Sequence, residues 1–127
     1  MTGAYSQSAP SAVLSVATKE HSVLIVDDDP IQLKLMRRHL IDAGFAVRTA
    51  SCASSALEAA RAERPDAIVS DVRMSELDGF MLCSLIRADD QLATIPIMLV
   101  TATFEGEGDR KLALAAGADS FVKFWFY

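Results

Sequence analysis

The stretch "VLIVDDDP", from Val23 to Pro30, sets four apolar residues directly before three consecutive aspartates and a proline. An unbroken apolar run is typical of a strand that is covered on both faces, as in a parallel sheet. Asp29 followed by Pro30 indicates a helix start, with Asp29 as the N-cap and Pro30 at the first helical position. The stretch therefore predicts a buried strand that leads into a helix, with carboxylates at the junction.

The same alternation of short apolar runs and amphipathic segments continues along the chain. Besides the first strand at 22–26, the pattern predicts strands at 45–50, 66–70, 95–101 and 120–124, and helices at 30–43, 54–64, 79–89 and 108–116. Strands separated by helices in this rhythm build a parallel sheet with right-handed crossovers. We therefore predict the α/β class with a doubly wound, five-stranded parallel sheet.

Length and composition predict one domain and exclude several classes of partner. The chain has 127 residues, 51% of them apolar, and a net charge of −5. Residues 1–20 are rich in Ser and Ala and show no period, so we expect a flexible leader before a domain at 21–127. The acidic balance argues against nucleic-acid binding. No apolar run approaches the roughly 20 residues of a membrane span, and no signal peptide is evident, so we expect a cytoplasmic protein without membrane contact.

Polar side chains follow four of the predicted strands. Asp27 and Asp28 follow the first strand, Asp71 the third and Thr101 the fourth, and Lys123 lies near the end of the fifth. Ligands of such sheets bind outside the carboxyl ends of the strands. Two unit charges 4 Å apart repel by about 4 kcal/mol at an effective dielectric of ~20, so the aspartates require a cation. Mg²⁺ favours carboxylate oxygens and pairs with phosphate, which predicts a site that can hold a phosphoryl group.

Four segments in this order resemble one family. They are "VLIVDDDP", "IVSDVRMSELDGF", "IMLVTA" and "AGADSFVK", and together they look like the receiver domain of bacterial two-component response regulators, from about His21 to Lys123. The resemblance implies the flavodoxin-like receiver fold. It also implies a signalling switch that takes a phosphoryl group from a histidine kinase or phosphotransfer protein. Such a domain catalyses its own phosphorylation and slow dephosphorylation but is not a turnover enzyme.

The resemblance also assigns roles to the residues at the strand ends. It implies that Asp71 is the phosphoacceptor and that Mg²⁺ is held by Asp27, Asp28, Asp71 and the backbone carbonyl of Arg73. Asp28 is the expected direct ligand, whereas Asp27 acts partly through water. Thr101 corresponds to the switch residue, whose hydroxyl turns toward the phosphoryl group.

The chain departs from the family pattern in and near the last strand. Phe121 corresponds to the aromatic switch residue and Lys123 to the phosphate-pairing lysine, but they are separated by two positions where the family has three. Because strand side chains alternate, one missing residue reverses the face that Lys123 uses. In the loop after the acceptor, Ser75 stands where the family usually has proline, while Gly79 matches the turn that closes this loop.

The sequence continues only to Tyr127, through the aromatic segment "FWFY", and a receiver normally continues into a last helix. We therefore expect an uncovered apolar sheet face and either an altered homodimer or a contact made by the aromatic tail. A receiver-fold interaction module with impaired or no phosphorylation switching is the alternative function. A hydrolase of the haloacid dehalogenase type is disfavoured, because that class has a second aspartate two positions after its nucleophile, where Arg73 stands here.

Overall fold

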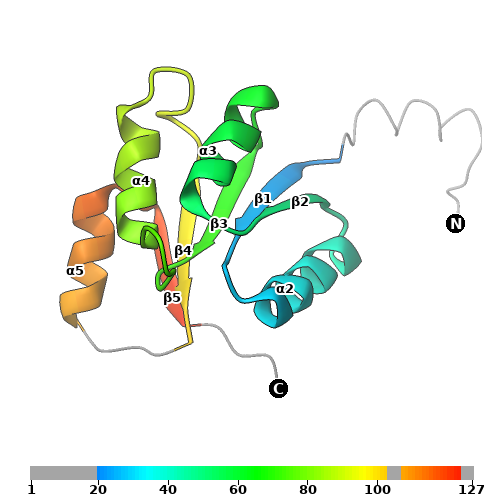
Figure 1. Cartoon of the computed structure of the whole chain (residues 1–127), viewed down its shortest axis with the longest axis horizontal. Helices are drawn as coiled ribbons and strands as arrows, with labels where there is room; N and C mark the ends of the chain where they lie inside the picture. Colours follow the sequence, from blue (N-terminus) through cyan, green and yellow to red (C-terminus); the bar gives the residue numbers. More distant parts are fainter. Residues whose placement is uncertain (1–19, 103–106, 124–127) are drawn as a thin grey trace, which may run out of the picture.

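The computed structural model of the chain describes residues 20–102 and 107–123. Its core is a five-stranded parallel sheet with the strand order β2-β1-β3-β4-β5 (Figure 1). The strands are β1 (Ser22–Val26), β2 (Ala46–Ala50), β3 (Ala67–Asp71), β4 (Ile97–Thr101) and β5 (Ser120–Lys123). After β2 the chain crosses over β1 to form β3, so the winding direction changes between β1 and β3. This switch point is where parallel sheets bind their ligands.

The helices cover the two faces of the sheet unequally. They are α2 (Pro30–Asp42), α3 (Ala53–Ala62), α4 (Gly79–Ala88) and α5 (Glu107–Ala116). In the described ranges, α3, α4 and α5 lie on one face and α2 lies on the other (Figure 1). The larger buried cluster, which includes Leu24, Leu99 and Phe121, lies under the three helices. The smaller one, which includes Ile25 and Val100, lies under α2.

Local sequence signals explain where α2 begins and ends. The Asp29 carboxylate accepts hydrogen bonds from the backbone N–H groups of Ile31 at 3.0 Å and Gln32 at 3.5 Å, and thereby satisfies donors that the first helical turn leaves open. Pro30 has no N–H and loses nothing at this position. Past the last turn, Gly44 has φ +101°, a left-handed conformation that favours glycine. The predicted caps of this helix are confirmed.

The predicted sheet is confirmed, with small differences at the element ends. The helix predicted at 54–64 ends at Ala62, because Glu63 is extended and donates its N–H back to the Ala59 carbonyl. Asp71 is the last residue of β3 and pairs with Val100 of β4 rather than lying in the following loop. The leader up to residue 19, the position 124 at the end of the predicted fifth strand and the aromatic tail lie outside the described residues.

Two further predictions concern helices. No helix follows β5 among the described residues, in agreement with a sheet face that lacks its usual cover. Within the same residues, none of the helices is both long enough and apolar enough to cross a lipid bilayer.

Candidate functional site

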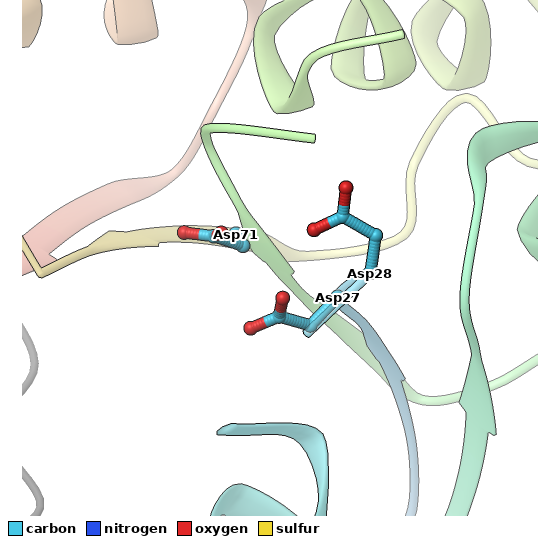
Figure 2. A group of neighbouring side chains, drawn as sticks. All are labelled: Asp27, Asp28 and Asp71. Atoms are coloured by element: carbon cyan, nitrogen blue, oxygen red, sulfur yellow. The ribbon is translucent and has the colours of Figure 1, made fainter. Parts of the chain in front are cut away.

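Three carboxylates meet at the carboxyl edge of the sheet. Asp27 and Asp28 follow β1 directly, and Asp71 ends the adjacent strand β3, whose Ser70 pairs with Val26. One carboxylate oxygen of each aspartate lies within 4.8 Å of those of the other two. Figure 2 shows the three side chains gathered beside one another, two from the end of β1 and one from β3. The structure therefore brings together the three aspartates that the sequence analysis selected.

Asp27 is the buried member of the cluster. Its side chain is fully enclosed, and one carboxylate oxygen accepts a hydrogen bond of 2.9 Å from the Asp29 N–H. The other oxygen, Oδ2, is buried without a hydrogen-bond partner. Burial, supported by the negative charges of Asp28 and Asp29, raises the pKa of Asp27 from 3.8 to about 6. An ionised, buried oxygen without a partner is costly, and a cation would satisfy it.

Asp28 connects the end of β1 to the loop after β3. Its Oδ2 accepts a hydrogen bond of 2.7 Å from the backbone N–H of Ser75. A proline at this position has no N–H and could not donate this bond. The departure from the family pattern at residue 75 thus has a structural consequence, because it ties the loop to an expected metal ligand.

Asp71 lies where the loop must turn sharply. Burial and the negative charge of Asp27 raise its pKa from 3.8 to about 7, against the lowering effect of the Val72 and Arg73 backbone N–H groups. The Val72 carbonyl accepts a hydrogen bond of 2.8 Å from the N–H of Gly79, which brings the start of α4 against the end of β3. A Cβ atom at Gly79 would overlap the Asp71 backbone carbonyl oxygen. The close approach explains why glycine occupies this position.

The remaining predicted residues lie on β4 and β5. Thr101 is buried at the end of β4, one residue beyond the partner of Asp71, and pairs in register with Lys123. Phe121 is buried under α3, α4 and α5. By alternation along the strand, Lys123 shares the sheet face of Phe121, whereas Val122 lies on the α2 face. Lys123 itself is exposed, as is Arg73 in the loop.

The cluster fits a magnesium ion by its donor chemistry. It offers hard carboxylate oxygens from three residues, and Mg²⁺ binds such oxygens together with backbone carbonyls and water. The partnerless Oδ2 of Asp27 is consistent with a missing cation. Asp27, Asp28, Asp71 and the carbonyl of Arg73 would hold the ion. Bound there, it would neutralise the negative charge of an arriving phosphoryl group.

Sequence reasoning missed two contacts of this site. The hydrogen bond between Ser75 and Asp28 joins residues 47 positions apart. The only available signal was the absence of proline at 75. The contact between Gly79 and the Asp71 carbonyl was likewise not foreseen, although glycine in the segment "LDG" indicated a tight turn.

The comparisons with known proteins agree with this geometry. Residues 23–123 match the family model described as the response regulator receiver domain. The transcriptional regulatory protein GltR of Pseudomonas aeruginosa is 38% identical over 101 residues, which cover 80% of this chain and 41% of that protein. The alkaline phosphatase synthesis transcriptional regulatory protein PhoP of Bacillus subtilis is 39% identical over 100 residues, 79% of this chain and 40% of that protein. The chain thus spans about two fifths of these relatives.

Solved structures give the same result. The chemotaxis protein CheY4 of Vibrio cholerae superimposes with a TM-score of 0.79 at 31% identity, over 85% of this chain and 89% of that one. The sheet order, the acidic cluster at its switch point and the sequence match lead to one conclusion. The chain belongs to the response regulator receiver domain family.

Proposed function

We propose that the chain is a phosphoryl-accepting switch of a two-component system, with Asp71 as the acceptor. The observation that carries the proposal is the convergence of three carboxylates within 4.8 Å at the switch point of the sheet. A histidine kinase or phosphotransfer protein is the proposed donor. The proposal places the chain in the cytoplasm, with Mg²⁺ as its cofactor and without contact to nucleic acid or membrane by this domain.

The proposed reaction is a transfer between two side chains. A carboxylate oxygen of Asp71 attacks the phosphorus of the donor's phosphohistidine, the new O–P bond forms, and the P–N bond breaks with the electron pair returning to the imidazole. Asp71 must be ionised to attack. Its raised pKa of about 7 means that the charge of a cation held with Asp27 and Asp28 would favour the reactive form.

Phosphorylation would change the surface through the neighbouring strands. The phosphoryl group adds roughly −1.5 to −2 charges, which shift an equilibrium between two surface conformations. In the proposal, the Thr101 hydroxyl donates a hydrogen bond to a phosphoryl oxygen, Lys123 pairs with another, and Phe121 changes its packing. Water then slowly removes the group, so the chain catalyses its own modification without turning over a substrate.

The direct test is incubation of the full chain with Mg²⁺ and acetyl phosphate, or with the phosphoryl mimic beryllium fluoride. Intact-mass spectrometry should detect one added phosphoryl group, and NMR should detect shifts around Thr101. Asp71→Asn should abolish both, whereas Asp42→Asn, an exposed aspartate of α2 that pairs with Arg38, should abolish neither. A chain that stays unmodified at saturating Mg²⁺ would reject the proposal.

A second candidate is a receiver-fold interaction module with impaired or no phosphorylation switching. Two observations favour it: Lys123 lies on the sheet face of Phe121, and no helix follows β5 in the described residues. Lys123→Ala separates the candidates. A switch that uses this lysine loses its beryllium fluoride response in the variant, whereas an interaction module shows no response before or after the substitution.

A further inference from the structure

The face of the sheet beside α2 retains an apolar hollow in the described part of the chain. It has a volume of about 280 Å³. Its lining is apolar apart from Asp119 and Ser120, and includes Val23, Phe45 and Met98. Met98 is 38% exposed although β4 has a strand on either side. The central strands of a parallel sheet are normally covered on both faces, so this face lacks a covering segment.

We propose that the aromatic tail, residues Phe124–Tyr127, folds back over this face and packs on Met98 and Val122. The tail follows Lys123, the last residue of the edge strand β5, and Val122 already lies on the α2 face. Four extended residues reach about 13 Å, whereas β5 from Ser120 to Lys123 measures about 10 Å. A tail that reverses after Lys123 can therefore reach the level of Ser120, which lines the hollow.

The chemistry of the tail suits the hollow. Its sequence is "FWFY", and each of these side chains can bury roughly 150–250 Å² of surface. The apolar lining offers contact area without requiring a charged partner. The other undescribed end of the chain, residues 1–19, contains a single aromatic, Tyr5, among mostly small and polar residues. The tail is thus the better match for this face.

The covalent link favours the tail of the same chain over that of a second copy. A segment attached without a linker has an effective concentration in the mM range, well above the μM concentrations at which such a protein is studied. We therefore assign the contact to a single molecule. The proposal is independent of phosphorylation and concerns the folded chain in any state.

Tryptophan fluorescence tests the proposal directly, because Trp125 is the only tryptophan of the sequence. In the full chain we expect its emission to be blue-shifted, and its quenching by acrylamide to be slower, than in the urea-unfolded chain. Met98→Asp would place a carboxylate beneath the tail and should shift the docking equilibrium toward the free tail by about tenfold or more, with red-shifted emission. Met98→Gln should act in the same direction with less disturbance of the fold.

Met81 supplies the matched control. It is 53% exposed on α4, on the opposite face of the sheet, so Met81→Asp and Met81→Gln should leave the Trp125 emission unchanged. Circular dichroism of each variant verifies that the fold persists. Emission that is equal in folded and unfolded chains, or that ignores both Met98 substitutions, would overturn the proposal.

Two more outcomes would assign the face to another occupant. If the blue shift weakens on dilution in step with a monomer–dimer equilibrium by sedimentation, a second copy covers the face. If deletion of residues 1–19 makes Trp125 accessible to acrylamide while Met98 substitutions do not, the leader holds the tail. Either result contradicts docking of the tail on Met98 within one chain.

Discussion

Gly79 lies so close to Asp71 that a Cβ atom at residue 79 would overlap the backbone carbonyl oxygen of the acceptor. That oxygen belongs to the backbone and cannot rotate away. We expect Gly79→Ala to displace Asp71 from Asp27 and to lower stability by about 1 to 3 kcal/mol. Urea unfolding measures the stability, and the rate of phosphorylation by acetyl phosphate measures the effect on the site.

Gly108 provides the control for this substitution. It lies in α5 with nothing within 4 Å of an added Cβ, so Gly108→Ala should be neutral or slightly stabilising. Equal losses in both variants would show that the contact with Asp71 is unimportant.

The raised pKa values predict how the stability of the metal-free chain depends on pH. Asp27 and Asp71 titrate at about 6 and about 7 in the folded chain, against 3.8 for the ordinary group. Between these limits the folded chain binds more protons than the unfolded chain, so its stability should fall as the pH rises through this window. Asp71→Asn removes the charge and should raise the melting temperature at neutral pH but not near pH 4. A variant that is less stable than the parent at neutral pH without divalent ions would refute this expectation.

Magnesium binding should depend on pH in the opposite sense. The ion competes with the protons of Asp27 and Asp71, so its affinity should weaken as the pH falls below about 7 and then about 6. Titration calorimetry at several pH values measures this. Asp28→Asn should weaken binding at every pH, whereas the exposed Asp90→Asn should not. An affinity that stays constant from pH 5 to pH 8, on the order of one ion per chain, would place the ion elsewhere.

The hydrogen bond from Ser75 to Asp28 can be removed without touching either carboxylate. Ser75→Pro deletes the backbone N–H, and loss of this bond to a charged acceptor should lower stability by about 1 kcal/mol in metal-free buffer. Ser75→Ala keeps the N–H and should behave like the parent chain. Chemical denaturation of the three proteins measures the difference, and equal midpoints for all three would show that the bond contributes nothing.

Arg87 connects α4 to the segments on either side of β4. Its guanidinium donates to the backbone carbonyls of Gly117, Ala93 and Ile95 and to the carboxylate of Asp119. Lysine cannot reach these acceptors in the same geometry. We expect Arg87→Lys to lower the free energy of unfolding by about 2 kcal/mol or more, because several buried carbonyls lose their donors.

Arg61 offers the comparison for Arg87. It pairs with Asp89 at 2.9 Å, and its side chain is 52% exposed. Exposed pairs of this kind contribute about 1 kcal/mol or less, so Arg61→Lys should have a small effect in the same denaturation experiment. A larger loss for Arg61→Lys than for Arg87→Lys would contradict the role assigned to Arg87.

The sequence was sufficient for those parts of the site that depend on local pattern and strand order. Asp29 and Pro30 announce a helix start by themselves, and parallel strands necessarily bring Asp27 and Asp71 to one edge. The contacts of Arg87, the bond between Ser75 and Asp28 and the partnerless oxygen of Asp27 could not be predicted in this way. They depend on loop paths and side-chain directions that are set only when segments distant in sequence pack together.

The strand order separates binding from response. The three carboxylates stand on β1 and β3, which are interior neighbours, whereas Thr101 and Lys123 stand on β4 and on the edge strand β5. Edge strands open locally at a lower free energy than interior ones. Fraying of β5 would therefore disconnect the residues proposed to sense the phosphoryl group while the ion-binding pair of strands stayed intact. Hydrogen exchange should detect this as two protection levels, with a chain that can still bind its cation after it has lost the means to respond.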